Sequence, residues 1–558
     1  MLQKRRRFGV LAGLAGLSAM SLVLGGCSLG VPRSGQVQAG LSDLRKSESG
    51  VLFDPASPVP GASQEEIVRG FVAAAASATD NYAIARQYLI PRYSQVWQPD
   101  ASVLIDDGAR RYSEVGEKAA TLSVSAIAAV DGNGELVPTP TQQNENKLRF
   151  EFEKYNGEWR IASAPSGIVL DKNIFNSTWL QSAVAFTAKN GDLLLDNRWV
   201  LRDGRTVTEL LQAMVTGPTK PLQQSVAQVF PQGAHLIETP VKVTDGEAVI
   251  NFSQELGQLD ESQLDVVNNQ VNATLAPLNV ITQYKLQVNG RTVRTQRVLA
   301  AAPRPVLWPY FVQGDKLASF EGASGQVPVG QAVVGQRPLA ATLGVEGSSA
   351  AILTQSGVRL VTGGGVRPVD GRAGVLPPSL DRYGFVWTAA SGSDTRLLAT
   401  SSADNSVVDL VLPHVGPQGA HRIQVSPDGT RLAILADDNG NTRVYVAGIS
   451  RNVAGKPTAV DPIMSVSMLA HGKPVDFSWL GNLQFAVLTQ LNASQRVTTG
   501  GNGSFNTDHG NVPTSVAIYG NGAHTSMRLL TERGTVLRFS GGTNWTTQAD
   551  DVKLLVKR

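Results

Sequence analysis

Residues 425–435 read Val-Ser-Pro-Asp-Gly-Thr-Arg-Leu-Ala-Ile-Leu, which is a strand end, a tight turn and a run of large apolar residues. The turn at 426–429 has proline in its second position, as type I turns favour. Looser versions of this phrase recur at intervals of about 40 to 50 residues, the period of propeller blades with four strands. They lie at 350–353, 383–387, 477–488 and 516–519. We therefore expect an all-β propeller of five or six blades over residues 303–558.

Two polar stretches interrupt this region. Residues 437–441 (Asp-Asp-Asn-Gly-Asn) offer oxygen ligands but lack the spaced carboxylates and distant glutamate of a calcium loop. They predict a hairpin turn instead. Residues 498–511 are rich in Gly and Asn and include Asp508 and His509. They predict a mobile excursion between two strands.

Residues 198–295 have an α+β pattern. A helix is expected to end at the stop pair Gly217-Pro218. Alternating strands flank Asp245-Gly246, and a helix over 262–275 places apolar residues on one face. The phrases 231–233 and 251–253 resemble site loops, but turn and strand-end chemistry explains them better.

Residues 62–170 begin with helices and continue as strands. Ser63 and Glu66 have the spacing of a capping box at a helix start. Strand-like stretches follow at 102–105, 122–130, 147–155 and 159–162. This order predicts a second α+β domain, with residues 171–197 as the connector to 198–295.

The N-terminus predicts export and a lipid anchor. Residues 4–7 are basic, residues 8–24 are apolar, and Leu-Gly-Gly-Cys follows at 24–27. This is the pattern of a secretory signal peptide over 1–26, cut between Gly26 and Cys27. The sequence matches the lipobox of bacterial lipoproteins, which implies N-acyl and S-diacylglycerol groups on Cys27. Residues 27–61 are Ser, Gly, Pro and polar, and predict a flexible tether.

Charge and cysteine content narrow the function classes. Without the four basic residues of the signal peptide, 45 basic residues face 46 acidic ones. This nearly neutral net charge leaves no cluster of basic residues that could bind the phosphates of a nucleic acid. Cys27 is the one cysteine of the chain, so no intramolecular disulfide can form.

The sequence lacks the common short motifs of metal sites, hydrolase nucleophiles and phosphate-binding loops. The six histidines form no His-x-x-x-His pattern, and there is no Gly-x-Ser-x-Gly elbow or phosphate-binding loop. We therefore expect no catalytic residue, no metal site and no cofactor. Catalytic groups can also meet from distant segments, so this expectation rests on motifs alone.

Several resemblances follow from these phrases. The pattern over 62–170, closing on Gly-Glu-Trp-Arg-Ile at 157–161, resembles the cone-shaped nuclear transport factor-like and cystatin-like domains. The turn motifs of 198–295 resemble the GerMN domain of envelope lipoproteins. The Ser-Pro-Asp-Gly phrase at 426–429 is typical of TolB-like blades. Their order behind a lipobox resembles the actinobacterial LpqB lipoproteins, as do Ala-Arg-Gln-Tyr-Leu at 85–89 and Trp-Gln-Pro at 97–99.

The LpqB resemblance implies a function. That family is linked to the MtrA–MtrB two-component system. It implies a protein anchored on the outer face of the cell membrane that binds the extracytoplasmic domain of an MtrB-like sensor histidine kinase and modulates envelope and division signalling. Two alternatives stay open: a protein that binds cell-wall glycan or peptide, and a hydrolase hidden in the propeller face. Only Cys27 carries over as a site residue.

The anchor is directly testable. We expect Cys27→Ala to abolish lipidation and release the protein from the membrane without unfolding it, because acyl chains supply the membrane affinity. Labelling cells with a radioactive fatty acid, followed by fractionation, measures both effects. A variant that is still labelled and membrane-bound contradicts the lipobox assignment.

Overall fold

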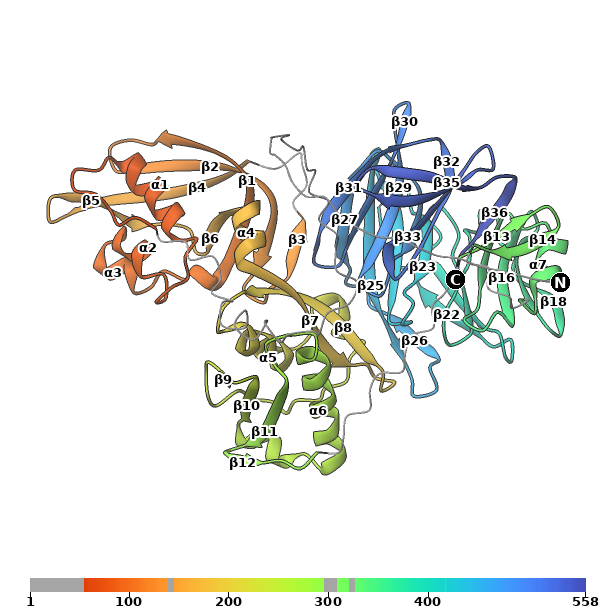
Figure 1. The fold of residues 1–558 in the computed structure, drawn as a ribbon, viewed down its shortest axis with the longest axis horizontal. Helices are drawn as coiled ribbons and strands as arrows, with labels where there is room; N and C mark the ends of the chain where they lie inside the picture. The colour runs from red at the N-terminus through yellow and green to blue at the C-terminus, as the bar shows by residue number, and fades with distance from the viewer. Residues whose placement is uncertain (1–54, 139–144, 296–308, 321–326, 417) are drawn as a thin grey trace, which may run out of the picture. The chain divides into compact units, whose positions relative to one another are not determined.

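The computed structural model describes residues 55–138, 145–295, 309–320, 327–416 and 418–558. The predicted signal peptide, with Gly26 and Cys27 at its predicted cleavage site, and most of the expected tether lie outside these residues. The described chain is mostly β, with a few short helices (Figure 1). Within the described ranges, no helix has both the length and the apolar character needed to cross a membrane.

The N-terminal domain packs short helices against a curved sheet. Its sheet runs in the order β5-β4-β2-β1-β6, with β3 paired to β2; β1 and β6 are parallel and the other pairs antiparallel. The expected capping box forms, since Ser63 and Glu66 each accept from the other's backbone N–H at the start of α1. The elements are α1 (Gln64–Ala74), α2 (Ala83–Gln87), α3 (Pro91–Ser94), β1 (Ser102–Glu114), β2 (Ala119–Asp131), β3 (Leu136–Pro138), β4 (Glu145–Tyr155), β5 (Glu158–Ser163) and β6 (Ile168–Asp171).

The middle domain combines a long hairpin with a small sheet. Strands β10 and β11 are parallel and joined through α6, which has a capping box of Asp260 and Gln263. The expected turn at Asp245-Gly246 forms, with both residues at positive φ. The elements are α4 (Lys172–Thr178), β7 (Trp179–Thr187), β8 (Leu193–Leu201), α5 (Thr206–Thr216), η4 (Lys220–Leu222), β9 (Val243–Thr244), β10 (Glu247–Phe252), η5 (Gln254–Gln258), α6 (Glu261–Leu275), β11 (Gln283–Val288) and β12 (Arg291–Thr292).

Hairpin β7–β8 belongs to two hydrophobic cores. On β8, Trp199 and Leu201 pack in the core of the N-terminal domain, whereas Val200 between them packs in the core of the middle domain. Side chains alternate between the faces of a strand, so one hairpin can serve as a wall for both cores. The stretch 171–197, expected as a connector, thus forms α4, β7 and the first half of β8.

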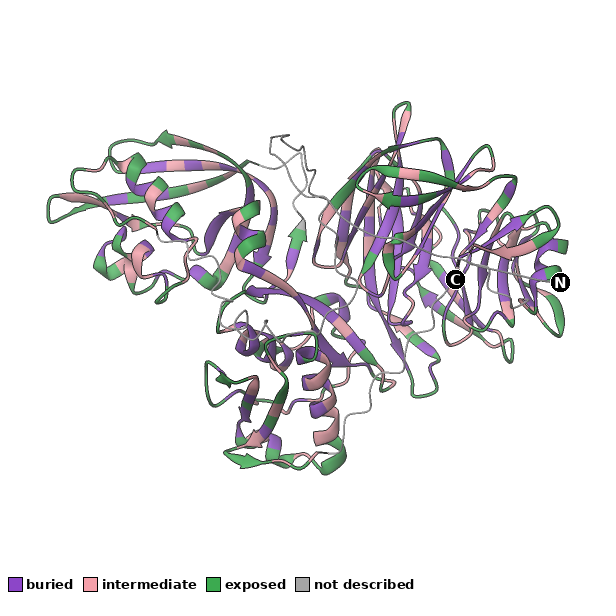
Figure 2. Cartoon of the chain, viewed as in Figure 1, coloured by how far each residue is buried: buried purple, intermediate pink, exposed green. Residues whose placement is uncertain are grey.

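The described residues from 309 onward form six antiparallel sheets. Strand β13 (Tyr310–Gln313) pairs with β14 (Lys316–Ser319) on one side and with the last strand, β36 (Val552–Val556), on the other, so both ends of the region share a sheet. Helix α7 (Gly330–Gly335) follows β14. Figure 2 shows the inner strands of these sheets largely buried. The next two sheets hold β15 (Ala340–Leu343), β16 (Ser349–Thr354), β17 (Gly357–Thr362) and β18 (Gly365–Asp370), then β19 (Ser379–Leu380), β20 (Phe385–Thr388), β21 (Arg396–Ser401) and β22 (Val407–Val411).

The last three sheets continue this pattern. Strand β25 is long enough to pair with β26 at one end and β27 at the other. The strands are β23 (Ala420–Val425), β24 (Arg431–Asp438), β25 (Asn441–Arg451), β26 (Pro457–Val460) and β27 (Ser465–His471), then β28 (Lys473–Trp479), β29 (Gln484–Leu491), β30 (Ser494–Gly501) and β31 (Ser504–Val512), then β32 (Ser515–Asn521), β33 (Ala523–Thr531), β34 (Val536–Gly541) and β35 (Asn544–Ala549).

The two polar stretches of this region have different outcomes. The hairpin turn predicted at 437–441 is confirmed, with Asn439 and Gly440 at positive φ between β24 and β25. The mobile excursion predicted for 498–511 is wrong. Those residues are most of the β30–β31 hairpin, with Thr498 paired to Asp508 and Thr499 to Thr507. Glycine and asparagine suggested a loop, but cross-strand pairing overrides their weak strand preference.

Trp479 offers a test of this region's independence. The ring is 2% exposed, contacts Phe485, and donates from Nε1 to the carbonyl of Gln424 at 3.1 Å. We expect Trp479→Ala to cost ~3–5 kcal/mol, because it leaves a cavity and an unpaired acceptor. Limited proteolysis with mapping of the fragments should reveal new cuts after residue 303 before cuts in 198–295. Simultaneous loss of resistance in both regions contradicts the separate-domain expectation.

Candidate functional site

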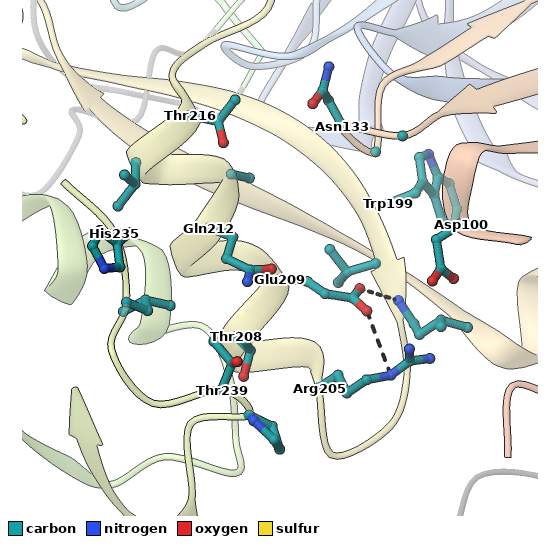
Figure 3. Close-up of a pocket in the computed structure, with 18 of the residues that line it drawn as sticks. Asp100, Asn133, Trp199, Arg205, Thr208, Glu209, Gln212, Thr216, His235 and Thr239 are labelled. Atoms are coloured by element: carbon teal, nitrogen blue, oxygen red, sulfur yellow. Dashed lines mark hydrogen bonds and ion pairs between the residues drawn. The ribbon is translucent and has the colours of Figure 1, made fainter. Parts of the chain in front are cut away.

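A cavity of about 730 Å³ opens beside helix α5 (Figure 3). Its walls are α5, strand β8 with the start of β7, the turn 131–134 with nearby Asp100, and the loop 234–240. We call it the α5 groove. Figure 3 shows Glu209 and Gln212 projecting from α5 into the space between His235 on one side and Asp100 on the other.

The Asp100 wall depends on a strained loop. Asp80, Asn81 and Tyr82 have positive φ in succession, a backbone conformation that costs free energy for residues other than glycine. Arg86 holds this loop by donating from Nε to the carbonyl of Asn81 at 2.8 Å. The buried Tyr82 hydroxyl then donates to Asp100 Oδ1 at 3.0 Å. Arg86 belongs to the phrase at 85–89 that the sequence analysis singled out, and this is its structural role.

The turn 131–134 docks directly on β8. The backbone N–H of Trp199 donates to the carbonyl of Gly134 at 2.8 Å. Gly134 has φ of +77°, and a Cβ at this position would lie 2.5 Å from the carbonyl oxygen of Trp199. Glycine is therefore required for this close approach.

Helix α5 supplies the charged wall. It ends at the expected Gly217, whose φ is 109°. Near its start, Arg205 Nε lies 3.1 Å from Asp203 Oδ2 and 3.9 Å from Glu209 Oε1. The other carboxylate oxygen of Glu209 accepts the backbone N–H of Leu201 at 3.0 Å. The guanidinium is thus closer to Asp203 than to Glu209.

The loop 234–240 closes the opposite wall. The N–H of Val241 donates to Thr208 Oγ1 on α5 at 2.8 Å. Ser253 accepts the N–H of His235 on its hydroxyl at 3.1 Å and donates its own N–H to the carbonyl of His235 at 2.9 Å. The phrase 251–253 therefore has the strand-end role that the sequence suggested, and it also places His235 at the groove.

Burial changes the pKa of the Glu209 carboxyl group in the groove. The pKa of Glu209 is raised from 4.5 to about 7, mainly because burial disfavours the charged form. The N–H of Leu201 and the charge of Arg205 act against this rise, while the negative charges of Asp203 and Asp100 add to it. Burial also raises the pKa of the Tyr82 hydroxyl above its usual value, which keeps it a hydrogen-bond donor.

A smaller crevice of about 240 Å³ is lined by the residues that directly follow the turn 131–134. Glu135 and Asp196 line it together with residues of β27, including Ser465 and Ser467. Burial, with the charge of Asp196 next, raises the pKa of Glu135 to about 7. Asp196 itself is buried and pairs with Arg198 at 2.7 Å.

The histidines lie at different places in the fold, except His509 and His524, whose ring centroids are 5.7 Å apart. His235 lines the α5 groove, and the buried His509 contacts Thr499 at 2.8 Å through Nε2. Among the described residues, no three His, Cys, Asp or Glu side chains are grouped so that they could hold a metal ion. The α5 groove could not be predicted from the sequence, because its residues form no short motif and come from five separate segments: Asp100, 131–134, Trp179, 199–216 and 234–240.

Comparison with known families covers most of the chain. A model described as the N-terminal domain of lipoprotein LpqB matches residues 57–176, and one described as the LpqB beta-propeller domain matches 313–554. A model of a domain of sporulation and spore germination matches 186–294.

Individual proteins that are similar to this chain include two lipoproteins and one solved structure. Lipoprotein LpqB of Cutibacterium acnes is 25% identical over 470 residues, covering 82% of this chain and 77% of that protein. Lipoprotein LpqB of Nocardia farcinica is 26% identical over 526 residues, covering 84% and 83%. The first GerMN domain of GerM from Bacillus subtilis is 21% identical, covers 20% of this chain and 86% of its own, and has a TM-score of 0.18.

The raised pKa of Glu209 predicts a pH-dependent stability. Since the folded state holds this proton more tightly than the unfolded chain, the native state loses stability as the pH rises from about 4.5 to about 7. Glu209→Gln removes this loss. As the pH rises from 5 to 8, the free energy of local unfolding of α5 in the variant should therefore increase by about 1–3 kcal/mol relative to the native chain.

Amide hydrogen exchange of α5 measures this effect, as the ratio of variant to native rates at each pH. The exposed Glu151 on β4 provides the control, Glu151→Gln, which should leave the ratio unchanged. A ratio for Glu209→Gln that is the same at pH 5 and pH 8 contradicts the assignment.

Proposed function

This chain belongs to the LpqB lipoprotein family, and from that premise we propose that it binds and modulates a sensor histidine kinase at the outer face of the cell membrane. The partner surface would be the extracytoplasmic domain of an MtrB-like kinase. The observation that supports the proposal most is the order of three matched domains over residues 57–554, two of which are specific to LpqB.

The anchor gives the proposal its physical basis. A lipid on Cys27 and a tether over 27–61 would confine the folded domains to a thin layer above the bilayer. Confinement of both partners to one membrane raises their effective concentration, so a weak contact becomes sufficient. A lipoprotein that prefers one conformation of the kinase then shifts its activity by the difference in affinity for the two conformations.

The proposal describes a binding protein rather than an enzyme. In the α5 groove, Arg205 is engaged by Asp203, and Glu209 accepts a backbone N–H from β8. These contacts hold the walls together, as expected of a docking surface.

Reconstitution tests the proposal. The kinase is placed in liposomes with its sensor domain exposed, and autophosphorylation is measured over a wide range of lipoprotein concentrations. We expect the full lipidated chain to change the rate, and Cys27→Ala to need a concentration at least about tenfold higher, because it binds from solution.

Controls separate this function from its alternatives. Equal kinase activity with and without the full chain removes the kinase proposal. Retention of the chain on purified sacculi under the same conditions would then favour binding to a cell-wall polymer. Equal potency of the native chain and Cys27→Ala would contradict the role of the anchor.

A further inference from the structure

We propose that the α5 groove binds an extended polypeptide segment that carries lysine or arginine next to apolar side chains. The inference deepens the proposed function and rests on it for the identity of the partner, since it names the chemistry of the kinase segment that would dock there.

The dimensions of the groove suit a few residues of a peptide. Ligand pockets commonly enclose about 300–1,000 Å³, and the groove's 730 Å³ falls within that range. Gln212, Thr216 and His235 on its walls are exposed, so the groove is open to solvent along one side. An open groove accepts a chain that enters and leaves, whereas a small metabolite is usually enclosed.

Charge in the groove favours a cationic ligand. Asp100, Asp131 and Glu209 line it, and of the described lining residues only Arg205 has a permanent positive charge. That guanidinium lies nearer to Asp203 than to Glu209, at 3.1 Å against 3.9 Å. The walls thus hold more negative than positive charge, and they would attract a lysine or arginine side chain of a ligand.

Glu209 is the group that would gain most from such a ligand. Burial and the neighbouring carboxylates raise its pKa to about 7, so near neutral pH a large share of this carboxyl is protonated. A cation placed beside it stabilises the ionised form and expels the proton. Binding would therefore strengthen as the pH rises from 6 to 8.

Apolar atoms complete the recognition. Val200, Leu201 and Leu236 line the same groove, with Val215 and Pro240. Lysine and arginine pack their methylene stems on apolar surface while the charged end stays in a polar environment. The groove offers both carboxylates and aliphatic side chains, and this combination suits a lysine or arginine of the ligand.

Other ligand classes fit less well. An anion would meet Asp203 and Glu209 close to the start of α5, where its N-terminal dipole would otherwise attract it. A sugar commonly stacks on an open aromatic face. Trp179 instead stacks on Phe175 with centroids 5.5 Å apart, and Trp199 lies between Phe175 and Phe505 at 4.7 and 5.6 Å.

The walls are held in place before any ligand arrives. Tyr82 fixes Asp100, the N–H of Trp199 fixes the turn 131–134, and Thr208 fixes the loop 234–240. A groove formed in advance loses less conformational freedom on binding.

Fluorescence anisotropy with a labelled, end-blocked hexapeptide of alternating lysine and leucine tests the inference on the full chain. Peptides with glutamine or glutamate in place of lysine are the ligand controls. The test protein is the double variant Asp100→Asn, Glu209→Gln, which keeps the acceptor for Tyr82 and the shape of both side chains. Its matched control, Glu151→Gln with Asp315→Asn, removes the same charge from exposed sites far from the groove in sequence.

We expect the lysine peptide to bind the native chain and the control variant alike, and the double variant at least about tenfold more weakly. Affinity of the native chain should rise from pH 6 to pH 8, and Glu209→Gln alone should flatten this dependence. Equal binding of the lysine and glutamine peptides, or equal affinity of the double variant and its control, overturns the inference.

The same variants separate this inference from the kinase proposal. A kinase sensor domain that binds the native chain and the double variant equally keeps the kinase proposal and removes the groove as its docking site. In another outcome, the lysine peptide binds as expected but the kinase sensor domain does not bind at all. This result supports the ligand class proposed for the groove and excludes the kinase as the source of that ligand.

Discussion

The structure from residue 57 to residue 554 depends on one hairpin, β7–β8. Its alternating side chains lie in two cores, with Trp199 on the side of the N-terminal domain and Val200 on the side of the middle domain. The third domain reaches the same element, since Trp199 Nε1 donates to the carbonyl of Gly503 at 2.7 Å and Phe505 packs on the Trp199 ring. A single hairpin therefore carries contacts from all three matched regions. Any change in its twist or position would be felt in each of them, because packed cores deform little.

The propeller also contacts this hairpin directly after the turn 426–429, whose sequence is typical of propeller blades. Arg431, which directly follows Ser426–Thr430, is completely buried and donates to the backbone carbonyl of Leu195 on β8. Its guanidinium also donates to Thr430 Oγ1 at 3.0 Å and lies 3.8 Å from Asp428. Burial lowers the pKa of this arginine, since its charge is removed from water. Such a group is stable only while its partners stay in place, so it fixes one arrangement of the hairpin and this sheet more than it adds to stability.

Local chemistry made much of the fold predictable, and distant contacts set the rest. The capping box of Ser63 and Glu66 and the turn at Asp245-Gly246 involve neighbours in sequence, so their residue types were sufficient. The hairpin at 498–511 was mistaken for a loop, because its strands are specified by pairing and by contacts with Trp199 some 300 residues earlier. The α5 groove had no sequence signal for the same reason. Asp100, Glu209 and His235 are ordinary polar residues until the fold brings them together.

The groove also explains why the chain retains features that reduce its stability. Three successive left-handed residues at 80–82 and a half-buried carboxylate at Glu209 both disfavour the folded state. Glu209 is not needed to fill a core, since α5 already buries Leu210, Leu211 and Met214 on its other face, whereas Tyr82 packs in the core of the N-terminal domain as well as holding Asp100. The loop places Asp100 near Glu209, and their mutual repulsion is part of what raises the pKa of Glu209. A bound cation would relieve that repulsion, and this relief would contribute to the free energy of binding. Backbone strain and a perturbed pKa at one place, on a wall held by hydrogen bonds, are common at binding sites.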